Sequence, residues 1–261
     1  MKHIFIPLLI LVAGHTFSQS LVTDRPSQTD ASSTVGKGVL QIESAFSFMT
    51  EDFETTLNST FALAPTRLQT FALPTVALRL GISDRLELRL ITQPELQQTF
   101  VEGAGTNKVF GVSDLQAGFK LNVLQSEEKR PEIAIISHIL LPTGTEGISG
   151  GEFGAINKVS VTHFLSQKHS LSYNVGHSYA GFGNGDLLYS LIWSISLADR
   201  VGVFVEAYGL LANMDEFMLN ADAGITYLIN DDVQFDYSFG VGVTQNMNYH
   251  AIGLSLRLPK K

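Results

Sequence analysis

Residues 114–124 read Asp-Leu-Gln-Ala-Gly-Phe-Lys-Leu-Asn-Val-Leu, with apolar and polar positions alternating up to Val123. Successive side chains of a β-strand point to opposite faces, so this stretch has one apolar face and one polar face. The same alternation recurs at 187–196 and at 233–243. Stretches of about ten such residues are typical of a membrane β-barrel, whose wall meets lipid outside and a polar interior inside.

The alternation continues from Gly38 to Leu258 and predicts about 12 strands. Most have the length of about 9–11 residues that a tilted membrane-spanning strand needs. Pro74 is expected to start the second strand, because proline cannot donate to a strand ladder. The predicted strands are 38–48, 74–82, 86–92, 111–124, 132–141, 157–165, 170–180, 186–196, 201–211, 218–227, 233–243 and 249–258.

Every second connection between these strands is compact, and the others are mostly longer. The compact connections are 83–85, 125–131, 166–169, 197–200 and 228–232, and the longest of the others are 49–73, 93–110 and the Gly-rich 142–156. Outer-membrane barrels have short periplasmic turns and longer external loops. We therefore expect an all-β fold, a transmembrane up-and-down antiparallel β-barrel at 38–261, with both termini periplasmic and 142–156 as a flexible external loop.

The N-terminus has the pattern of an export signal. Lys2 and His3 precede an apolar run from Ile4 to Ala13, and Thr16-Phe17-Ser18 offers small residues before Gln19. A membrane-anchoring helix is the alternative, but it needs about 18 or more apolar residues. We expect residues 1–18 to be a cleaved signal peptide and 19–37 to be a periplasmic N-terminal segment.

Composition and charge narrow the class of partner. The chain has no cysteine, which suits an exported protein, and its formal net charge of −8 makes nucleic acid an unsuitable partner. A water-soluble barrel would have the same period with its faces exchanged, but the export signal and the aromatic-rich apolar face favour lipid outside. The expected partners are outer-membrane lipid, a small-molecule solute, and the outer-membrane assembly machinery, which would recognise the alternating strand at 253–258.

The polar phase of the strands carries charged residues of both signs. The residues expected to line the lumen are Glu43, Arg79, Glu87, Arg89, Asp114, Lys120, Glu206, Asp222, Asp236 and Arg257. Separated charges of opposite sign can select solutes in a pore, whereas charges paired across neighbouring strands simply fill the interior. A barrel of about 12 strands lies between the filled eight-stranded and the open 16-stranded sizes, so both interpretations stay open.

The sequences Thr23-Asp24-Arg25-Pro26 and Gln41-Ile42-Glu43 resemble the opening signature of the outer-membrane transporter-like barrels named for the meta-pathway of phenol degradation. Leu80 to Leu88 resembles the first hairpin of the same family. The signature residues are Asp24, Arg25, Pro26, Gln41 and Glu43. The resemblance implies a transporter or porin, with hydrophobic or aromatic small molecules as a substrate class.

The charged pair Asp24-Arg25 precedes the first strand and can bond into the periplasmic mouth of the barrel. Two hypotheses follow for this segment, a plug inside the barrel or an ordinary tether.

Catalysis is not expected. A twelve-stranded barrel resembles the outer-membrane phospholipases, in which a His-x-Ser pair lies on one face of a strand. In this sequence His169-Ser170 and His177-Ser178 are adjacent, so the two side chains of each pair point to opposite faces of a strand. His138 and His163 have no second metal ligand at a recognisable spacing, and no cofactor is expected. The sequence predicts a channel for passive or facilitated passage of small solutes. The competing hypothesis is a closed structural barrel, or one that binds a ligand or partner through its external loops.

Overall fold

The computed structural model describes residues 21–57, 62–102, 105–127 and 130–258. The predicted signal peptide therefore lies outside the described residues. Fourteen strands of the described part form one antiparallel sheet. They are β1 (Leu40–Leu57), β2 (Ala62–Ser83), β3 (Leu86–Thr92), β4 (Pro94–Val101), β5 (Gly105–Val112), β6 (Leu115–Leu124), β7 (Glu132–Leu141), β8 (Gly154–Phe164), β9 (His169–Tyr179), β10 (Asp186–Ala198), β11 (Val201–Ala212), β12 (Glu216–Asn230), β13 (Val233–Gly242) and β14 (Asn246–Leu258).

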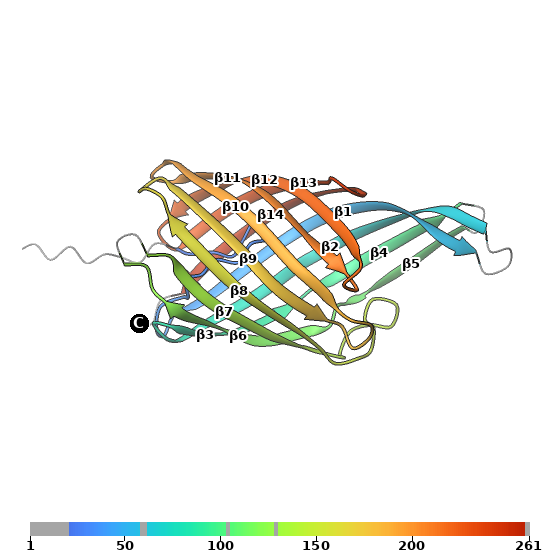
Figure 1. The fold of residues 1–261 in the computed structure, drawn as a ribbon, viewed down its shortest axis with the longest axis horizontal. Helices are drawn as coiled ribbons and strands as arrows, with labels where there is room; N and C mark the ends of the chain where they lie inside the picture. Colours follow the sequence, from blue (N-terminus) through green and yellow to red (C-terminus); the bar gives the residue numbers. More distant parts are fainter. Residues whose placement is uncertain (1–20, 58–61, 103–104, 128–129, 259–261) are drawn as a thin grey trace, which may run out of the picture.

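The sheet closes on itself because β1 pairs with both β14 and β2. From β14 each strand pairs with the preceding one down to β6, which pairs with β3, and β3 pairs with β2. The predicted closed antiparallel barrel of 12 strands is confirmed. Leu40 lies opposite Leu258, so β1 begins where β14 ends. The short turns lie at this end of the barrel, which carries the C label in Figure 1.

The strands β4 and β5 lie outside the ring. β1 and β2 continue past the barrel and pair as far as Leu57 and Ala62, and β4 and β5 add to the outer half of β2. The result is a four-stranded extension that projects from the end opposite the short turns (Figure 1). The predicted loops 49–73 and 93–110 are therefore wrong, since both consist largely of strand. Beyond the bilayer a strand has no need of a lipid-facing apolar side, so the alternation that marks the other strands is absent there.

Pro74 lies inside β2 and does not begin it, which corrects the prediction. The register between β1 and β2 shifts between Ala45 and Ser47, opposite Pro74. This irregularity is a β-bulge, a place where a strand tolerates proline. β2 also exchanges partners here, because Val76 pairs with β3 and Ala72 pairs with β4. The proline therefore marks the boundary between the barrel and the extension.

The predicted strand 111–124 is likewise divided. β5 ends at Val112 and β6 begins at Leu115, and the backbone N–H of Ser113 donates to the carbonyl of Gln93, 2.9 Å away. The extension therefore leaves and rejoins the barrel at neighbouring points.

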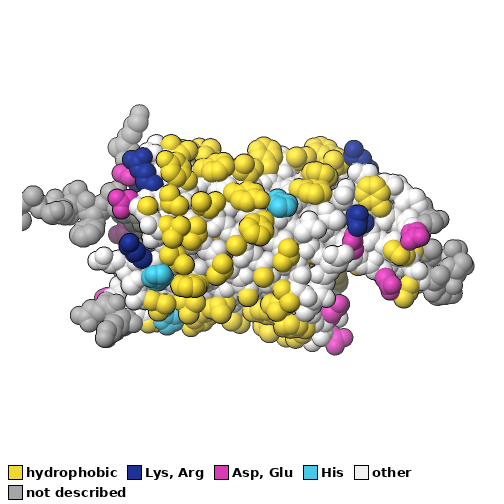
Figure 2. Space-filling view, turned by 90° about the horizontal axis from the view of Figure 1, so that it is seen from above, with side chains coloured by type: hydrophobic (Ala, Val, Ile, Leu, Met, Phe, Trp, Pro, Cys, Tyr) yellow, Lys and Arg dark blue, Asp and Glu magenta, His cyan; other side chains and the backbone are white. Residues whose placement is uncertain are grey.

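The two faces of the wall are clearly different. Phe119, Leu121 and Val123 are exposed, whereas Lys120 and Asn122, which alternate with them, are buried. Figure 2 shows hydrophobic side chains over the middle of the visible face, with Lys, Arg, Asp and Glu toward its two ends. Within the described residues no helix is long and apolar enough to cross a membrane. The exposed apolar band and the polar interior are those of a transmembrane barrel.

The interior is filled mainly by polar side chains. Many of the largest fully buried side chains are charged or amides, namely Arg79, Lys120, Gln41, Glu43, Glu87, Asn122 and Asp236. Buried charges are costly unless they are paired and hydrogen-bonded. Each of these buried groups therefore needs a partner inside the barrel.

Candidate functional site

Residues 21–37, called the plug from here on, lie inside the barrel at its short-turn end. The plug forms no helix or strand, and its backbone groups bond to side chains of the wall. The N–H groups of Gln28 and Val35 donate to carboxylate oxygens of Glu206 and Glu87, at 2.8 and 2.7 Å. Since a buried backbone N–H needs a partner, these wall carboxylates take the place of a strand ladder. The peptide bond between Arg25 and Pro26 is cis.

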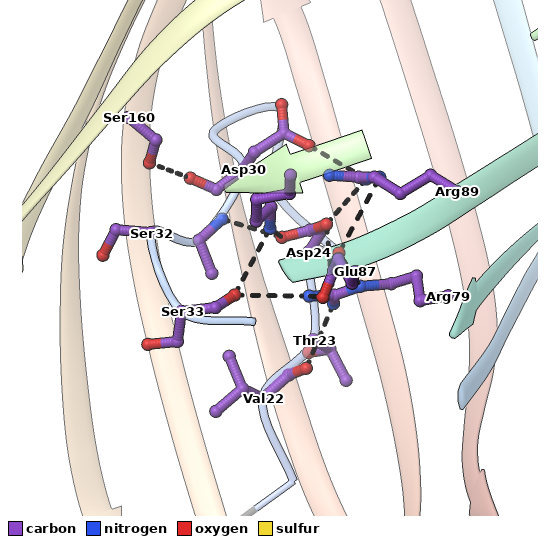
Figure 3. Close-up of polar contacts among 12 residues, drawn as sticks. Val22, Thr23, Asp24, Asp30, Ser32, Ser33, Arg79, Glu87, Arg89 and Ser160 are labelled. Atoms are coloured by element: carbon purple, nitrogen blue, oxygen red, sulfur yellow. Dashed lines mark hydrogen bonds and ion pairs between the residues drawn. The ribbon is translucent and has the colours of Figure 1, made fainter. Parts of the chain in front are cut away.

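Asp24 is the centre of the plug's contact with the wall (Figure 3). Its carboxylate lies 2.7 Å from Arg89 Nη2, 2.7 Å from Lys120 Nζ and 3.5 Å from Arg79 Nη1. It also accepts the backbone N–H of Ala31 at 2.8 Å, which fixes the curve of the plug. One plug carboxylate is thus bound by cations from three strands.

Asp30 makes the second acidic contact. Its carboxylate lies 3.2 Å from Arg89 Nη2 and forms an ion pair with Lys158, and its carbonyl accepts the hydroxyl of Ser160 at 2.7 Å. Figure 3 shows Asp24 and Asp30 both directed toward Arg89. Charge-assisted bonds of this kind are stronger than neutral ones. The two plug carboxylates therefore hold the plug to β3, β6 and β8.

In a second set of contacts the carboxylates belong to the wall and the donors belong to the plug. The guanidinium of Arg25 lies 3.1 Å from Asp236, and the N–H of Thr29 donates to Glu206 at 2.7 Å. The hydroxyls of Ser32 and Ser33 donate to Glu132, at 3.0 and 2.6 Å. The plug thus presents acids to basic parts of the wall and donors to acidic parts.

Arg79 is paired mainly within the wall. It donates to both carboxylate oxygens of Glu87, at 2.8 and 3.0 Å, and to Glu43 at 2.7 Å. Its side chain is fully buried. Because β2 and β3 form one hairpin, a bidentate contact across it gives Arg79 a fixed position from which to contact the plug.

The family signature describes the junction between plug and wall. Gln41 Nε2 donates to the carbonyl of Val22 and to Glu43, both at 2.7 Å. Glu43 in turn accepts the backbone N–H groups of Asp24 and Arg25, at 3.1 and 3.2 Å. Residues far apart in the signature therefore meet in one buried cluster.

The structure places most of the charged residues singled out from the sequence around the plug. Glu43, Arg79, Glu87, Arg89, Lys120, Glu206 and Asp236 all contact it directly. Asp222 lies opposite Glu206 in the register and accepts the hydroxyl of Tyr249 at 2.5 Å.

Asp114 and Arg257 have other positions. Asp114 lies in the connection before β6, where it accepts the N–H of Gly144 at 2.9 Å and the hydroxyl of Ser149 at 2.6 Å. Arg257 pairs with Asp232 of the β12–β13 turn at 2.7 Å. Asp114 therefore anchors the Gly-rich loop. Arg257 anchors the β12–β13 turn and lies opposite Gln41 in the register.

Sequence reasoning missed Asp30, Glu132 and Lys158. Glu132 and Lys158 occupy the polar phase of β7 and β8, so strict periodicity is the signal that marks them as interior residues. Asp30 lies in a segment without periodicity, and only its placement inside the lumen reveals its partners.

The lumen also contains a cavity and a cluster of apolar side chains. A cavity of about 500 Å³ lies at the short-turn end, between the plug and a wall that includes Ser172, Ile192 and Phe204. Toward the extension the lumen contains a mostly apolar cluster of Met49, Tyr208, Met247, Tyr249 and Ala251. This cluster adds an apolar surface to a lumen whose buried side chains are otherwise mainly polar.

The histidines considered for catalysis make structural contacts. His169 stacks on Trp193 with ring centroids 5.8 Å apart, and His177 Nε2 lies 3.1 Å from the carbonyl oxygen of Asn184. These contacts assign both side chains to the packing of strands and loops.

Residues 23–258 match the family model described as "Putative MetA-pathway of phenol degradation". The chain belongs to this family. The match to the phenol-pathway family begins at Thr23 in the plug and ends at Leu258 in β14, so it includes both the plug and the barrel. None of the curated proteins compared with the chain matches it significantly.

Solved structures similar to this member of the phenol-pathway family are outer-membrane barrels. The COG4313 outer membrane channel from Pseudomonas putida F1 has a TM-score of 0.70 at 11% identity, covering 89% of this chain and 100% of that one. The KdgM porin has a TM-score of 0.51 at 6% identity, covering 83% and 98%. The NalP translocator domain from Neisseria meningitidis has a TM-score of 0.51 at 14% identity, covering 86% and 90%. The fold is that of these outer-membrane barrels.

Proposed function

We propose that this protein is an outer-membrane channel for passive or facilitated passage of small solutes, obstructed at its short-turn end by the plug. The observation that carries the proposal is the nature of the obstruction. A closed ring with an apolar exterior surrounds a polar lumen, and the segment that fills this lumen at the short-turn end is held by non-covalent ion pairs. Such a segment can move without unfolding the wall.

The orientation and location follow from the same proposal. Residues 1–18 are removed as a signal peptide, the termini and the plug face the periplasm, and the extension lies outside the cell. The assembly machinery inserts the barrel into outer-membrane lipid by recognising β14. The protein has no catalytic role in this proposal.

The solute class is hydrophobic or aromatic small molecules. The cluster of Met49, Tyr208, Met247 and Tyr249 on the extension side of the plug supports it, because methionine and tyrosine offer adaptable apolar contacts. The family description, which refers to phenol degradation, supports the same class.

A closed structural or ligand-binding barrel is the second candidate. The filling of the short-turn half of the lumen by residues 21–37 favours it, since paired charges in a full interior need no transport role.

Ion conductance in planar bilayers separates the two candidates. The purified chain is compared with a variant that lacks residues 21–35, and heat-modifiable gel migration verifies that both are folded. For a plugged channel we expect small or intermittent openings from the intact chain and larger, steady openings from the variant. Silence from both folded proteins would contradict the channel and favour the closed barrel, and equal conductance would contradict the obstructing role of the plug.

A further inference from the structure

Arg89, Lys120 and Lys158, called the cationic trio, face the lumen from β3, β6 and β8. Their close carboxylate partners come from the plug. Lys120 binds Asp24, Lys158 binds Asp30, and Arg89 Nη2 binds both. Among the described residues the one wall carboxylate within ion-pair distance of the trio is Glu87, 4.0 Å from Arg89. The wall therefore holds three cations and leaves most of their neutralisation to the plug.

The trio also has unused hydrogen-bonding capacity. Arg89 is 5% exposed, and its Nε and Nη1 atoms have no hydrogen-bond partner in the described part of the chain. Arg89 lies opposite Gly118 in the register, and Gly118 lies opposite His138. The ring of His138 covers Gly118, and its Nε2 atom is also buried without a hydrogen-bond partner among the described residues. A guanidinium carries five N–H donors and no acceptor. This part of the wall can therefore bind more acceptor groups than the plug supplies.

We propose that the cationic trio is the binding site of an organic anion with two carboxylates, which replaces Asp24 and Asp30 and thereby releases the plug. Uncompensated buried cations are strongly unfavourable. The plug is therefore expected to stay in place until another anion takes over its two charges. Ile136 lies between Lys120 and Lys158 in the register and is fully buried, so the body of the anion meets an apolar side chain between its two charged ends. This anion site rests on the channel function proposed above. It narrows the proposed aromatic solutes to those that carry two carboxylates, and it adds an opening mechanism.

The absence of native cysteine allows a direct test. The variant Ala31→Cys places a thiol in the plug, where the backbone N–H of Ala31 donates to Asp24. The rate of maleimide labelling of the detergent-solubilised full chain then reports release of the plug. We expect phthalate, an aromatic dicarboxylate, to accelerate labelling severalfold at constant ionic strength, and its uncharged dimethyl ester to leave the rate unchanged. No acceleration by phthalate, or equal acceleration by the ester, would overturn the proposal.

Two substitutions locate the site. In the Ala31→Cys background, Arg89→Gln and Lys158→Gln are each expected to increase the phthalate concentration needed for half-maximal acceleration. Lys168→Gln is the matched control, since Lys168 lies in the exposed β8–β9 turn. If both trio variants respond to phthalate as the control does, the trio is not the site.

Conductance of the same proteins distinguishes failure of this inference from failure of the channel. Phthalate-dependent labelling in a barrel that never conducts would support the anion site and contradict the channel. Conductance that accompanies labelling insensitive to phthalate would support the channel and contradict the anion site.

Discussion

Asp24 is the single side chain on which plug binding depends most. It touches Arg89, Lys120 and Arg79, and its own carboxylate oxygen closes the turn to Ala31. Removing one partner of a buried ion pair leaves the other charge uncompensated, at a cost of about 3–5 kcal/mol. Because several cations share Asp24, its loss affects more than one of them.

We therefore expect Asp24→Asn to weaken docking of the plug by about 3–5 kcal/mol while leaving the barrel folded. The amide keeps the volume of the side chain and loses its charge. Protection of a cysteine at position 31 from maleimide measures the change. Asp52→Asn is the control, because Asp52 pairs with Arg67 on the extension and not with the plug. If the cysteine at position 31 is equally protected in Asp24→Asn and in the chain that keeps Asp24, the central role of Asp24 is contradicted.

The Asp52–Arg67 pair illustrates a charge contact outside the membrane. The hydrogen bond from Arg67 lowers the pKa of the Asp52 carboxyl below its usual value. The stabilisation that this pair contributes is therefore present above the pKa of an unfolded aspartate and is lost as pH falls through the lowered value. We expect Arg67→Gln to raise the pKa of Asp52 toward its ordinary value, as measured by NMR titration. Thermal unfolding should hardly change, because exposed pairs contribute little; an unchanged Asp52 pKa would contradict the assignment.

At the scale of the element, β2 is both barrel wall and seat for the plug. The backbone of Gly81 exchanges hydrogen bonds with Gly38 and Val39, where the plug leads into β1. A Cβ atom at Gly81 would lie 2.0 Å from the carbonyl oxygen of Gly36 and 2.8 Å from that of Val35. The absence of a side chain at this one position lets the end of the plug lie against the wall.

We expect Gly81→Ala to push residues 35 and 36 away from β2, with a cost of about 1–3 kcal/mol to plug docking. Gly202→Ala is the matched control, since its Cβ would meet the Thr226 hydroxyl, a side-chain group that can rotate. Plug protection at position 31 measures both variants. If the cysteine at position 31 is as well protected in Gly81→Ala as in Gly202→Ala, the close approach of Gly36 to Gly81 does not hold the plug.

The elements that could be predicted from sequence were those that lipid constrains. Strands such as 132–141 and 186–196 alternate because one face meets lipid and the other meets the lumen. The outer parts of β1 and β2 lack this constraint, and Pro74 concealed their continuity with the barrel because its bulge was not visible in sequence. The charged residues on the inner face followed from periodicity, but their pairing with Asp24 and Asp30 did not. A segment without periodicity has no register from which its contacts can be derived.

At the scale of the whole molecule, the extension is separable from the barrel. As strands, β4 and β5 pair with each other and with the outer half of β2, and the ring closes without them. The end of β5 also exchanges two hydrogen bonds with the Gly-rich loop, between Val112 and Thr145. The two ends of the segment that forms β4 and β5 meet where the backbone N–H of Ser113 donates to the carbonyl of Gln93.

Replacing residues 94–112 by a two-residue Asn-Gly turn is therefore expected to leave a folded barrel, because such a turn suits antiparallel strands. Heat-modifiable gel migration and the midpoint of thermal unfolding should stay close to those of the full chain. The control is a replacement of the same length at 132–150, which removes β7 from the ring. Loss of folding in both variants would show that the extension is required for the barrel.

The seam between β1 and β14 has a consequence for the order of assembly. The plug precedes β1 in the chain, and the ring becomes complete only when β14, the final strand, pairs with β1. Until then the wall is an open trough, and the cations that bind the Asp24 carboxylate lie in β2, β3 and β6, the strands that follow β1 around the ring. The plug can therefore settle sideways into a half-built barrel and be enclosed by the last strand, without ever threading through a finished pore.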